Sequence, residues 1–294
     1  MIIVEIGRGL GNSMYVYAAG KALAEHHNTE LKLDLSHIKS WPKIEKFGGE
    51  WEFELGKFNI SAKEATNKEL RKFVIKTKFR PLDKLIRKYK LFERRVYYFP
   101  TSGKVKDFFK LPNNIYLWGY FGHEKFFKPI KKIIREEFTL KEKYKEKINP
   151  LLNKISKENS VGIHVRRGDL LKIGALVLPL DYYKKAISII KKKTKKPIFY
   201  IFSDDLEWCK KNFISLGEKF NFIRGTKSWE DFELMRNCKH NILANSALSW
   251  WAGYLNKNPK KIVISPYPFT QWISNDYFDN VPKGWKKIKV IKNE

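Results

Sequence analysis

The chain has few cysteines and no long apolar run, and these absences exclude several classes of protein. Its 294 residues include only Cys209 and Cys238, too few for a disulfide framework or a cysteine-based zinc site. A reducing compartment suits such a chain, so we expect it in the cytoplasm. No stretch of about 18 apolar residues predicts a membrane-spanning helix. The first residues lack the basic region of a signal peptide.

Several catalytic signatures are missing as well. The sequence contains no P-loop, no G-x-S-x-G elbow, no H-E-x-x-H helix and no D-x-D pair that would hold a metal on a diphosphate. Its six histidines do not cluster. We therefore predict no metal site, and expect any bound diphosphate to be held by arginines and helix N-termini rather than by magnesium.

Positive charge is in large excess, because 59 Lys and Arg stand against 31 Asp and Glu, a net charge of +28. Such a charge attracts anions, although a lysine-rich solvated surface explains it equally well. The strongest run is 68–99, where residues Leu82 to Phe92 show helical spacing with Lys84, Arg87 and Lys88 on the other face. This pattern predicts either an ordinary surface helix or an amphipathic helix on an anionic membrane. No nucleic-acid-binding module is recognisable, so we expect no nucleic-acid partner.

Apolar runs and helical patterns alternate along the chain. The first half predicts strands at 2–6, 31–35 and 115–121, helices at 14–25 and 126–138, and a glycine-rich loop at 7–12. The second half predicts strands at 161–165, 197–202, 220–224, 241–244 and 261–265, with helices at 180–192, 206–213, 230–237 and 247–255. This alternation predicts an α/β fold with parallel sheets, divided into domains at 1–152 and 153–294.

Ligands of parallel sheets bind beyond the carboxyl ends of the strands, so the residues there are the candidate site. His164, Arg166, Arg167, Gly168 and Asp169 end or follow the strand at 161–165. Two adjacent guanidinium groups suit phosphate oxygens, although an arginine pair also forms surface ion pairs.

Two further strand ends carry polar residues that fit two roles. Asp204 and Asp205 precede a predicted helix, as do Asn245 and Ser246. Such residues cap helices, and a helix N-terminus also binds phosphate. Both roles stay open at these positions.

Four motifs in order resemble the bacterial α-1,2-fucosyltransferases of glycosyltransferase family 11. The family's G-x-G-L-G-N opening is matched from Gly7 to Asn12, and its H-V-R-R-G-D from His164 to Asp169. F-S-D-D is matched from Phe202 to Asp205, and L-M-x-x-C-K-H-N-I-x-A-N-S-x-x-S-W-W from Leu234 to Trp251.

The resemblance implies a GT-B architecture, in which two Rossmann-like domains face across a cleft. It implies inverting, metal-independent transfer of L-fucose from GDP-β-L-fucose to a galactoside hydroxyl, O2 by family type, in a surface glycan. By the same resemblance, Arg166 and Arg167 contact the diphosphate, His164 and Asp231 face the guanosine, and Asn12 approaches the donor from the first domain. Asp204 and Asp205 line the pocket, while Asn245 and Ser246 begin a phosphate-binding helix.

The general base is left open by the sequence. An inverting transfer normally uses a carboxylate or a histidine to take the acceptor's proton. Asp169 and Glu5 are candidates, Asp169 could equally hold the arginines in place, and a dissociative transition state could need no base. Two other functions remain as alternatives: transfer of another nucleotide-activated sugar, and a non-catalytic basic module that binds membranes or nucleic acid.

Overall fold

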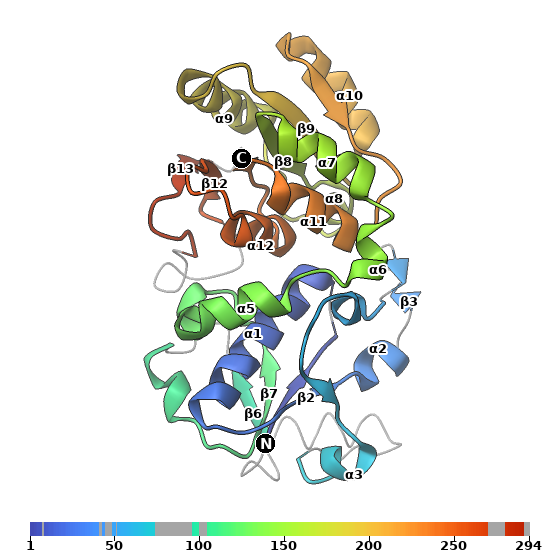
Figure 1. Cartoon of the computed structure of the whole chain (residues 1–294), viewed down its shortest axis with the longest axis vertical. Helices are drawn as coiled ribbons and strands as arrows, with labels where there is room; N and C mark the ends of the chain where they lie inside the picture. Colours follow the sequence, from blue (N-terminus) through green and yellow to red (C-terminus); the bar gives the residue numbers. More distant parts are fainter. Residues whose placement is uncertain are drawn as a thin grey trace. The chain divides into compact units, whose positions relative to one another are not determined.

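The computed structural model describes residues 1–7, 9–40, 43–44, 49–50, 52–73, 96–99, 105–269 and 280–290. The chain forms two compact units (Figure 1). Unit 1 comprises Met1–Ile44 and Glu50–Thr139, and unit 2 comprises Glu45–Gly49 and Leu140–Glu294. The units divide at Thr139 rather than at residue 152, because helix α7 (Asn149–Lys157) packs against α11 and β8 of unit 2. The basic segment Leu82–Phe92 lies outside the described residues.

Unit 1 is built on a five-stranded sheet in the order β5-β2-β1-β7-β6, in which every neighbouring pair is parallel. Its strands are β1 (Ile2–Glu5), β2 (Leu31–Asp34), β5 (Lys63–Glu64), β6 (Val96–Phe99) and β7 (Ile115–Gly119). The short strands β3 (Lys43–Ile44) and β4 (Gly49–Glu50) pair with each other.

Helix α1 (Leu10–His26) is almost wholly buried and packs on β1. Gly20 permits this close approach, because a Cβ there would lie 2.3 Å from Cγ1 of Val4. The helix begins at Leu10 and not at Met14, since the carbonyl of Gly9 accepts the N–H groups of Asn12 and Ser13. Asn12 therefore lies in the first helical turn, and the predicted loop is shorter than expected.

The remaining helices of unit 1 are short. The predicted helix at 126–138 is broken around Pro129 into two 3₁₀ turns and a seven-residue helix, because proline cannot continue the hydrogen-bond pattern of a helix interior. These elements are α2 (Ser36–Ser40), α3 (Asn67–Leu70), α5 (Lys131–Glu137), η2 (Glu54–Lys57), η3 (Val105–Lys110), η4 (Glu124–Phe126) and η5 (Lys128–Ile130).

Unit 2 is built on a six-stranded parallel sheet in the order β10-β9-β8-β11-β12-β13. Its strands are β8 (Ser160–Val165), β9 (Ile198–Ser203), β10 (Phe220–Phe222), β11 (His240–Ile242), β12 (Val263–Tyr267) and β13 (Lys286–Lys289). The predicted α/β fold with parallel sheets is confirmed. Strand β13 was not predicted from the sequence.

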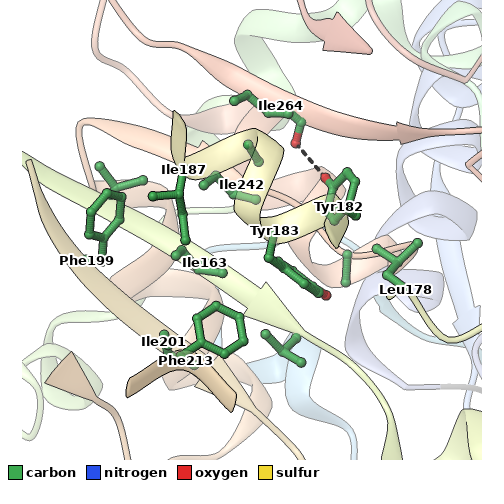
Figure 2. Close-up of a cluster of buried hydrophobic side chains, with 14 of the residues drawn as sticks. Ile163, Leu178, Tyr182, Tyr183, Ile187, Phe199, Ile201, Phe213, Ile242 and Ile264 are labelled. Carbon is green, nitrogen blue, oxygen red and sulfur yellow. Dashed lines mark hydrogen bonds between the residues drawn. The ribbon is translucent and has the colours of Figure 1, made fainter. Parts of the chain in front are cut away.

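Helices cover both faces of this sheet. Helices α9 (Leu180–Lys193) and α10 (Leu206–Phe213) form the core of one face, in which Tyr183, Ile187 and Phe213 pack against the strands (Figure 2). The hydroxyl of Tyr182 donates to the carbonyl of Leu243 at 2.7 Å and also lies 3.4 Å from the carbonyl of Ile264 (Figure 2). The other helices of unit 2 are α6 (Glu142–Lys145), α7, α8 (Gly168–Lys172), η6 (Ile214–Leu216), α11 (Ser228–Asn237) and α12 (Ala247–Leu255).

The strand order of unit 2 reverses between β8 and β11. The chain proceeds from β8 to β9 and β10 on one side, then returns to place β11 on the other side of β8. Such a reversal opens a crevice at the carboxyl ends of the two central strands, and ligands of open α/β sheets bind there. The topology therefore points to the segments after Val165 and after Ile242.

Candidate functional site at the carboxyl edge of the second sheet

The predicted site residues of unit 2 lie at one edge of its sheet. Arg166 follows β8, Asp204 follows β9, Asn245 follows β11, and Asp231 lies in the first turn of α11, which follows β10. Because all six strands are parallel, these segments share the carboxyl edge. Asn12 belongs to unit 1, where it lies at the start of α1.

Arg166 is held by Asp169. Its Nε donates to Oδ1 of Asp169 at 2.9 Å, and its Nη2 donates to Oδ2. Burial disfavours the charge of the guanidinium, but the hydrogen bond and the charge of Asp169 outweigh it and raise the pKa of Arg166. The pair forms because the chain after β8 turns into helix α8, which brings residues 166 and 169 together. Arg166 is thus a fixed cation at the switch point, the place where the strand order reverses between β8 and β11.

Both oxygens of Asp169 are engaged by Arg166. This two-point contact holds the guanidinium in one orientation. The geometry therefore favours the positioning role over the role of general base.

Arg167 is directed toward α10. Its guanidinium carbon lies 4.0 Å from the ring centroid of Trp208, and its Nε donates to Oδ2 of Asp205 at 3.2 Å. The indole face and the carboxylate fix the side chain, which is only 17% exposed. Trp208 was missed by the sequence reasoning, although it lies three residues after Asp205, on the same face of a helix.

The two aspartates after β9 organise the loop after β8. Asp204 accepts the backbone N–H groups of Arg167 and Gly168 at 2.9 and 3.1 Å. Asp205 caps α10 by accepting the N–H of Trp208 at 3.1 Å. A Cβ at Gly168 would lie 3.3 Å from Oδ2 of Asp204, so glycine suits this approach. Of the two roles left open by the sequence, Asp205 takes that of the cap.

His164 lies on β8, two residues before Arg166, and is buried. Burial, together with the charge of Arg166, lowers the pKa of His164 to about 3, so the imidazole is neutral at physiological pH. Its Nδ1 has no hydrogen-bond partner within the described part of the chain. A buried polar atom without a partner costs free energy, and at a sheet edge it marks a place where a ligand or a shift of the loop would supply one.

The segment after β11 presents an open helix N-terminus. Ser246 occupies the N-cap position of α12, but its side chain makes no capping hydrogen bond. Asn245 donates from Nδ2 to the carbonyl of Leu176 at 2.8 Å, while its buried Oδ1 has no partner among the described residues. The first N–H groups of α12 are therefore left uncapped by side chains, at the strand next to β8, which suits an anion.

Asp231 is directed toward the loop after β10, where its Oδ1 accepts the hydroxyl of Thr226 at 2.5 Å. Within the described ranges, no three His, Cys, Asp or Glu side chains are grouped so that they could hold a metal ion. The same part of the chain has no helix that is long and apolar enough to cross a membrane.

Unit 1 carries its own polar cluster at the carboxyl edge of its sheet. The hydroxyl of Tyr116 lies 3.0 Å from Oε2 of Glu5 and 2.9 Å from Oδ2 of Asp34. Burial and the two carboxylates raise the pKa of Tyr116 well above 10, so the phenol keeps its proton. The phenol has one hydrogen, so it donates to only one of the two carboxylates at a time. Tyr116 was not predicted as a site residue.

The chain is similar in sequence to known glycosyltransferases. The sequence matches the model of glycosyl transferase family 11 over residues 61–289. It is 32% identical to an α-1,2-colitosyltransferase of Escherichia coli, over 98% of this chain and 99% of the relative. It is 30% identical to the O-antigen biosynthesis glycosyltransferase WbnK of Escherichia coli, over 88% of this chain and 91% of the relative.

Solved structures show a likeness in fold. The NodZ α-1,6-fucosyltransferase, in crystals soaked with GDP-fucose, matches 86% of this chain and 92% of its own, with a TM-score of 0.55 and 14% identity.

Proposed function

Because the chain belongs to glycosyl transferase family 11 and has a GT-B fold, we propose that this glycosyltransferase moves L-fucose from GDP-β-L-fucose to O2 of a galactoside. The observation that carries the proposal is the fixed cation Arg166, which follows β8 at the switch point. The neighbouring strand β11 leads to α12, whose N-cap side chain makes no capping hydrogen bond. Relatives named as α-1,2-colitosyl and galactoside α-(1,2)-fucosyltransferases support this linkage and acceptor.

In the proposed reaction the acceptor hydroxyl attacks the anomeric carbon of fucose from the face opposite the nucleotide. The bond between this carbon and the phosphate oxygen breaks, and GDP leaves with the electron pair, so a β-linked donor gives an α-linked product. Negative charge grows on the departing diphosphate. Arg166 and the first N–H groups of α12 would stabilise that charge, because they are oriented before the reaction begins.

The other residues of this edge would bind the rest of the donor. His164 and Asp231 are proposed to face the guanosine, with His164 acting as a neutral hydrogen-bonding group. Arg167 keeps its contacts with Trp208 and Asp205 and directs its remaining N–H groups to the diphosphate. Asp204 shapes the loop, Asn245 and Ser246 position the start of α12, and Asn12 contacts the donor from unit 1.

We propose Glu5 as the group that receives the acceptor's proton. Asp169 is engaged by Arg166 through both oxygens, whereas Glu5 shares a single hydroxyl hydrogen with Asp34. Replacement by Gln should lower kcat by about 10²–10⁴ and leave the affinity for GDP unchanged.

A second donor is favoured by one specific observation, the 32% identity to a colitosyltransferase over nearly the whole chain. Nucleotide-activated colitose therefore belongs in any donor panel beside GDP-fucose. Faster transfer from the colitose donor would assign the chain to that activity on the same scaffold.

Nucleotide binding tests the proposed site most simply. The purified chain should be stabilised against thermal unfolding by GDP and GDP-fucose, more than by UDP or ADP. Arg166→Ala should lose this stabilisation, while the matched control Arg71→Ala, an exposed arginine at the end of α3 in unit 1, should keep it. Equal stabilisation by all nucleotides, or an unaffected Arg166→Ala variant, would contradict the proposal.

A further inference from the structure

The two edges of the second sheet differ in charge. The segments after the strands, at 166–179, 204–205, 223–227 and 243–246, contain five cationic residues and three carboxylates, a net charge of +2. The segments before the strands, at 158–159, 194–197, 214–219, 238–239, 256–262 and 280–285, contain eight lysines and two glutamates, a net charge of +6. We call these latter segments the amino edge. They lie at the end of the sheet opposite the candidate site.

Most of the lysines at the amino edge are free to meet a partner. Six are exposed and form no ion pair with a described residue: Lys195, Lys196, Lys219, Lys257, Lys260 and Lys283. Lys261 is excluded from this group, because it donates to the carbonyls that end α12. The two glutamates are engaged elsewhere, Glu158 by the hydroxyl of Tyr200 and Glu218 by Lys191.

The topology places these lysines in one row. Every helix-to-strand connection of a parallel sheet reaches the same edge, and the segments precede β10, β9, β12 and β13, which span most of the sheet. Six strands about 4.8 Å apart extend over about 24 Å. The last turn of α9 adds Lys192 and Lys193, both exposed, at the same end. The charges therefore form a broad face and not a compact pocket.

An exposed apolar side chain stands at this edge. Ile214 begins η6, the turn before β10, and is 67% exposed; the carboxyl edge exposes Leu171 and Ile173 to a smaller extent, 55% and 40%. A cationic surface that also presents an apolar side chain to solvent has the composition of a surface that binds anionic membranes.

We propose that the amino edge of unit 2 docks on an anionic lipid bilayer. All eight cations of its segments are lysines, which are compact, strongly hydrated charges suited to the diffuse potential of a lipid surface. Recognition of nucleic acid relies on arginine forks and on aromatic side chains for stacking, and the amino-edge segments contain no arginine. Docking by this edge would leave the carboxyl edge, with Arg166, directed away from the bilayer and accessible to donor and acceptor.

Vesicle flotation with the full chain tests the proposal. The chain should bind vesicles of phosphatidylcholine with 30 mol% phosphatidylglycerol, fail to bind phosphatidylcholine alone, and be released by about 0.5 M salt because of screening. An edge variant with Lys195, Lys196, Lys257 and Lys260 changed to Gln should bind at least about tenfold more weakly, since each lysine adds a comparable share of the attraction. A control with Lys63, Lys125, Lys128 and Lys132 of unit 1 changed to Gln removes the same charge from exposed positions elsewhere and should bind almost normally.

Ile214→Ser separates the apolar contribution from the charge. It should weaken binding several-fold while leaving the salt dependence unchanged, because no charge is altered. The proposal is overturned if the native chain does not prefer anionic vesicles, or if the edge and control variants lose equal affinity. If the native chain binds duplex DNA but not vesicles, and the edge variant no longer binds DNA, the edge is a nucleic-acid-binding surface instead. Turnover of GDP-fucose with a soluble acceptor should be unchanged in the edge variant, so a failure of docking and a failure of the proposed activity are distinguishable.

Discussion

The pairing of Arg166 with Asp169 leads to a prediction about how the two residues share one role. In Asp169→Asn, the Oδ1 acceptor for Nε of Arg166 is retained, but the second acceptor becomes an amide NH₂ that faces the Nη2 donor. The guanidinium would rotate away from the strand end. The pair is partly exposed, 37% for Arg166 and 19% for Asp169. Solvent therefore screens it, and the loss of stability should be only about 1 kcal/mol.

The effect on catalysis should be much larger than the effect on stability. Removal of one donor to the developing charge, as in Arg166→Ala, should cost about 3–4 kcal/mol of barrier, or roughly 10²–10³ in kcat. Misplacement of the same donor in Asp169→Asn should cost about 10–100-fold. If Asp169 acts through Arg166, the double variant should turn over no more slowly than Arg166→Ala alone, because the second change has nothing left to disturb.

The assay compares the native chain, the two single variants and the double variant. It measures the initial rate of GDP release and the affinity for GDP by calorimetry. Asp181→Asn is the matched control, because this exposed carboxylate also pairs with a residue three positions along its helix, Lys184 at 3.4 Å. A base at Asp169 would give a different result: GDP affinity would be unchanged in Asp169→Asn, and the losses in kcat would add in the double variant. Additive losses would refute the positioning role.

Further predictions concern the proton at Glu5, burial of His164, packing of α1 and independence from metal. Glu5→Gln should lower kcat by about 10²–10⁴ with GDP affinity unchanged, and an unchanged kcat would exclude Glu5 as base. Because the pKa of His164 is lowered to about 3, the unfolded state takes up a proton below pH 6.5 while the folded state does not. Stability should therefore fall by about 2 kcal/mol more between pH 6.5 and pH 5 in the native chain than in His164→Asn, measured by urea unfolding. Gly20→Ala should destabilise unit 1 by about 1–3 kcal/mol because its Cβ would overlap Val4, while Gly9→Ala, with open space around it, should change stability by less than half of that. Transfer should proceed at the same rate with and without EDTA, and a rate restored only by Mg²⁺ would overturn the proposed arginine-based stabilisation.

Local pattern was sufficient to predict the regular elements of unit 2. The bounds of α10 and α12 match the predicted helices at 206–213 and 247–255, because both have strong periodicity and a polar residue before the first turn. Strand β13 was missed because Lys286, Lys287 and Lys289 give it no apolar alternation, and it is formed by pairing with β12. Helix α7 was not predicted; its Pro150 lies in the first turn, where proline is favourable.

The sequence predicted where the site residues lie, but not which residues they contact. Strand ends and motif order identified the segments that the parallel sheet brings to one edge. The sequence could not show that Asp204 binds two backbone N–H groups 36 and 37 residues away, or that Trp208 supports Arg167, because these contacts depend on the neighbouring positions of β8 and β9. The link between Tyr116 and Glu5 joins strands 111 residues apart for the same reason.

Product analysis of the transfer reaction decides whether this chain is an α-1,2-fucosyltransferase. The full chain is incubated with GDP-β-L-fucose and a galactoside acceptor, and the product is examined by NMR for the linkage and the anomeric configuration of the new sugar. We expect an α-linked fucose on O2 of galactose, formed by the native chain and absent with Arg166→Ala. A folded native chain that binds no guanine nucleotide and forms no fucoside, or an Arg166→Ala variant that forms it at the native rate, would contradict the account.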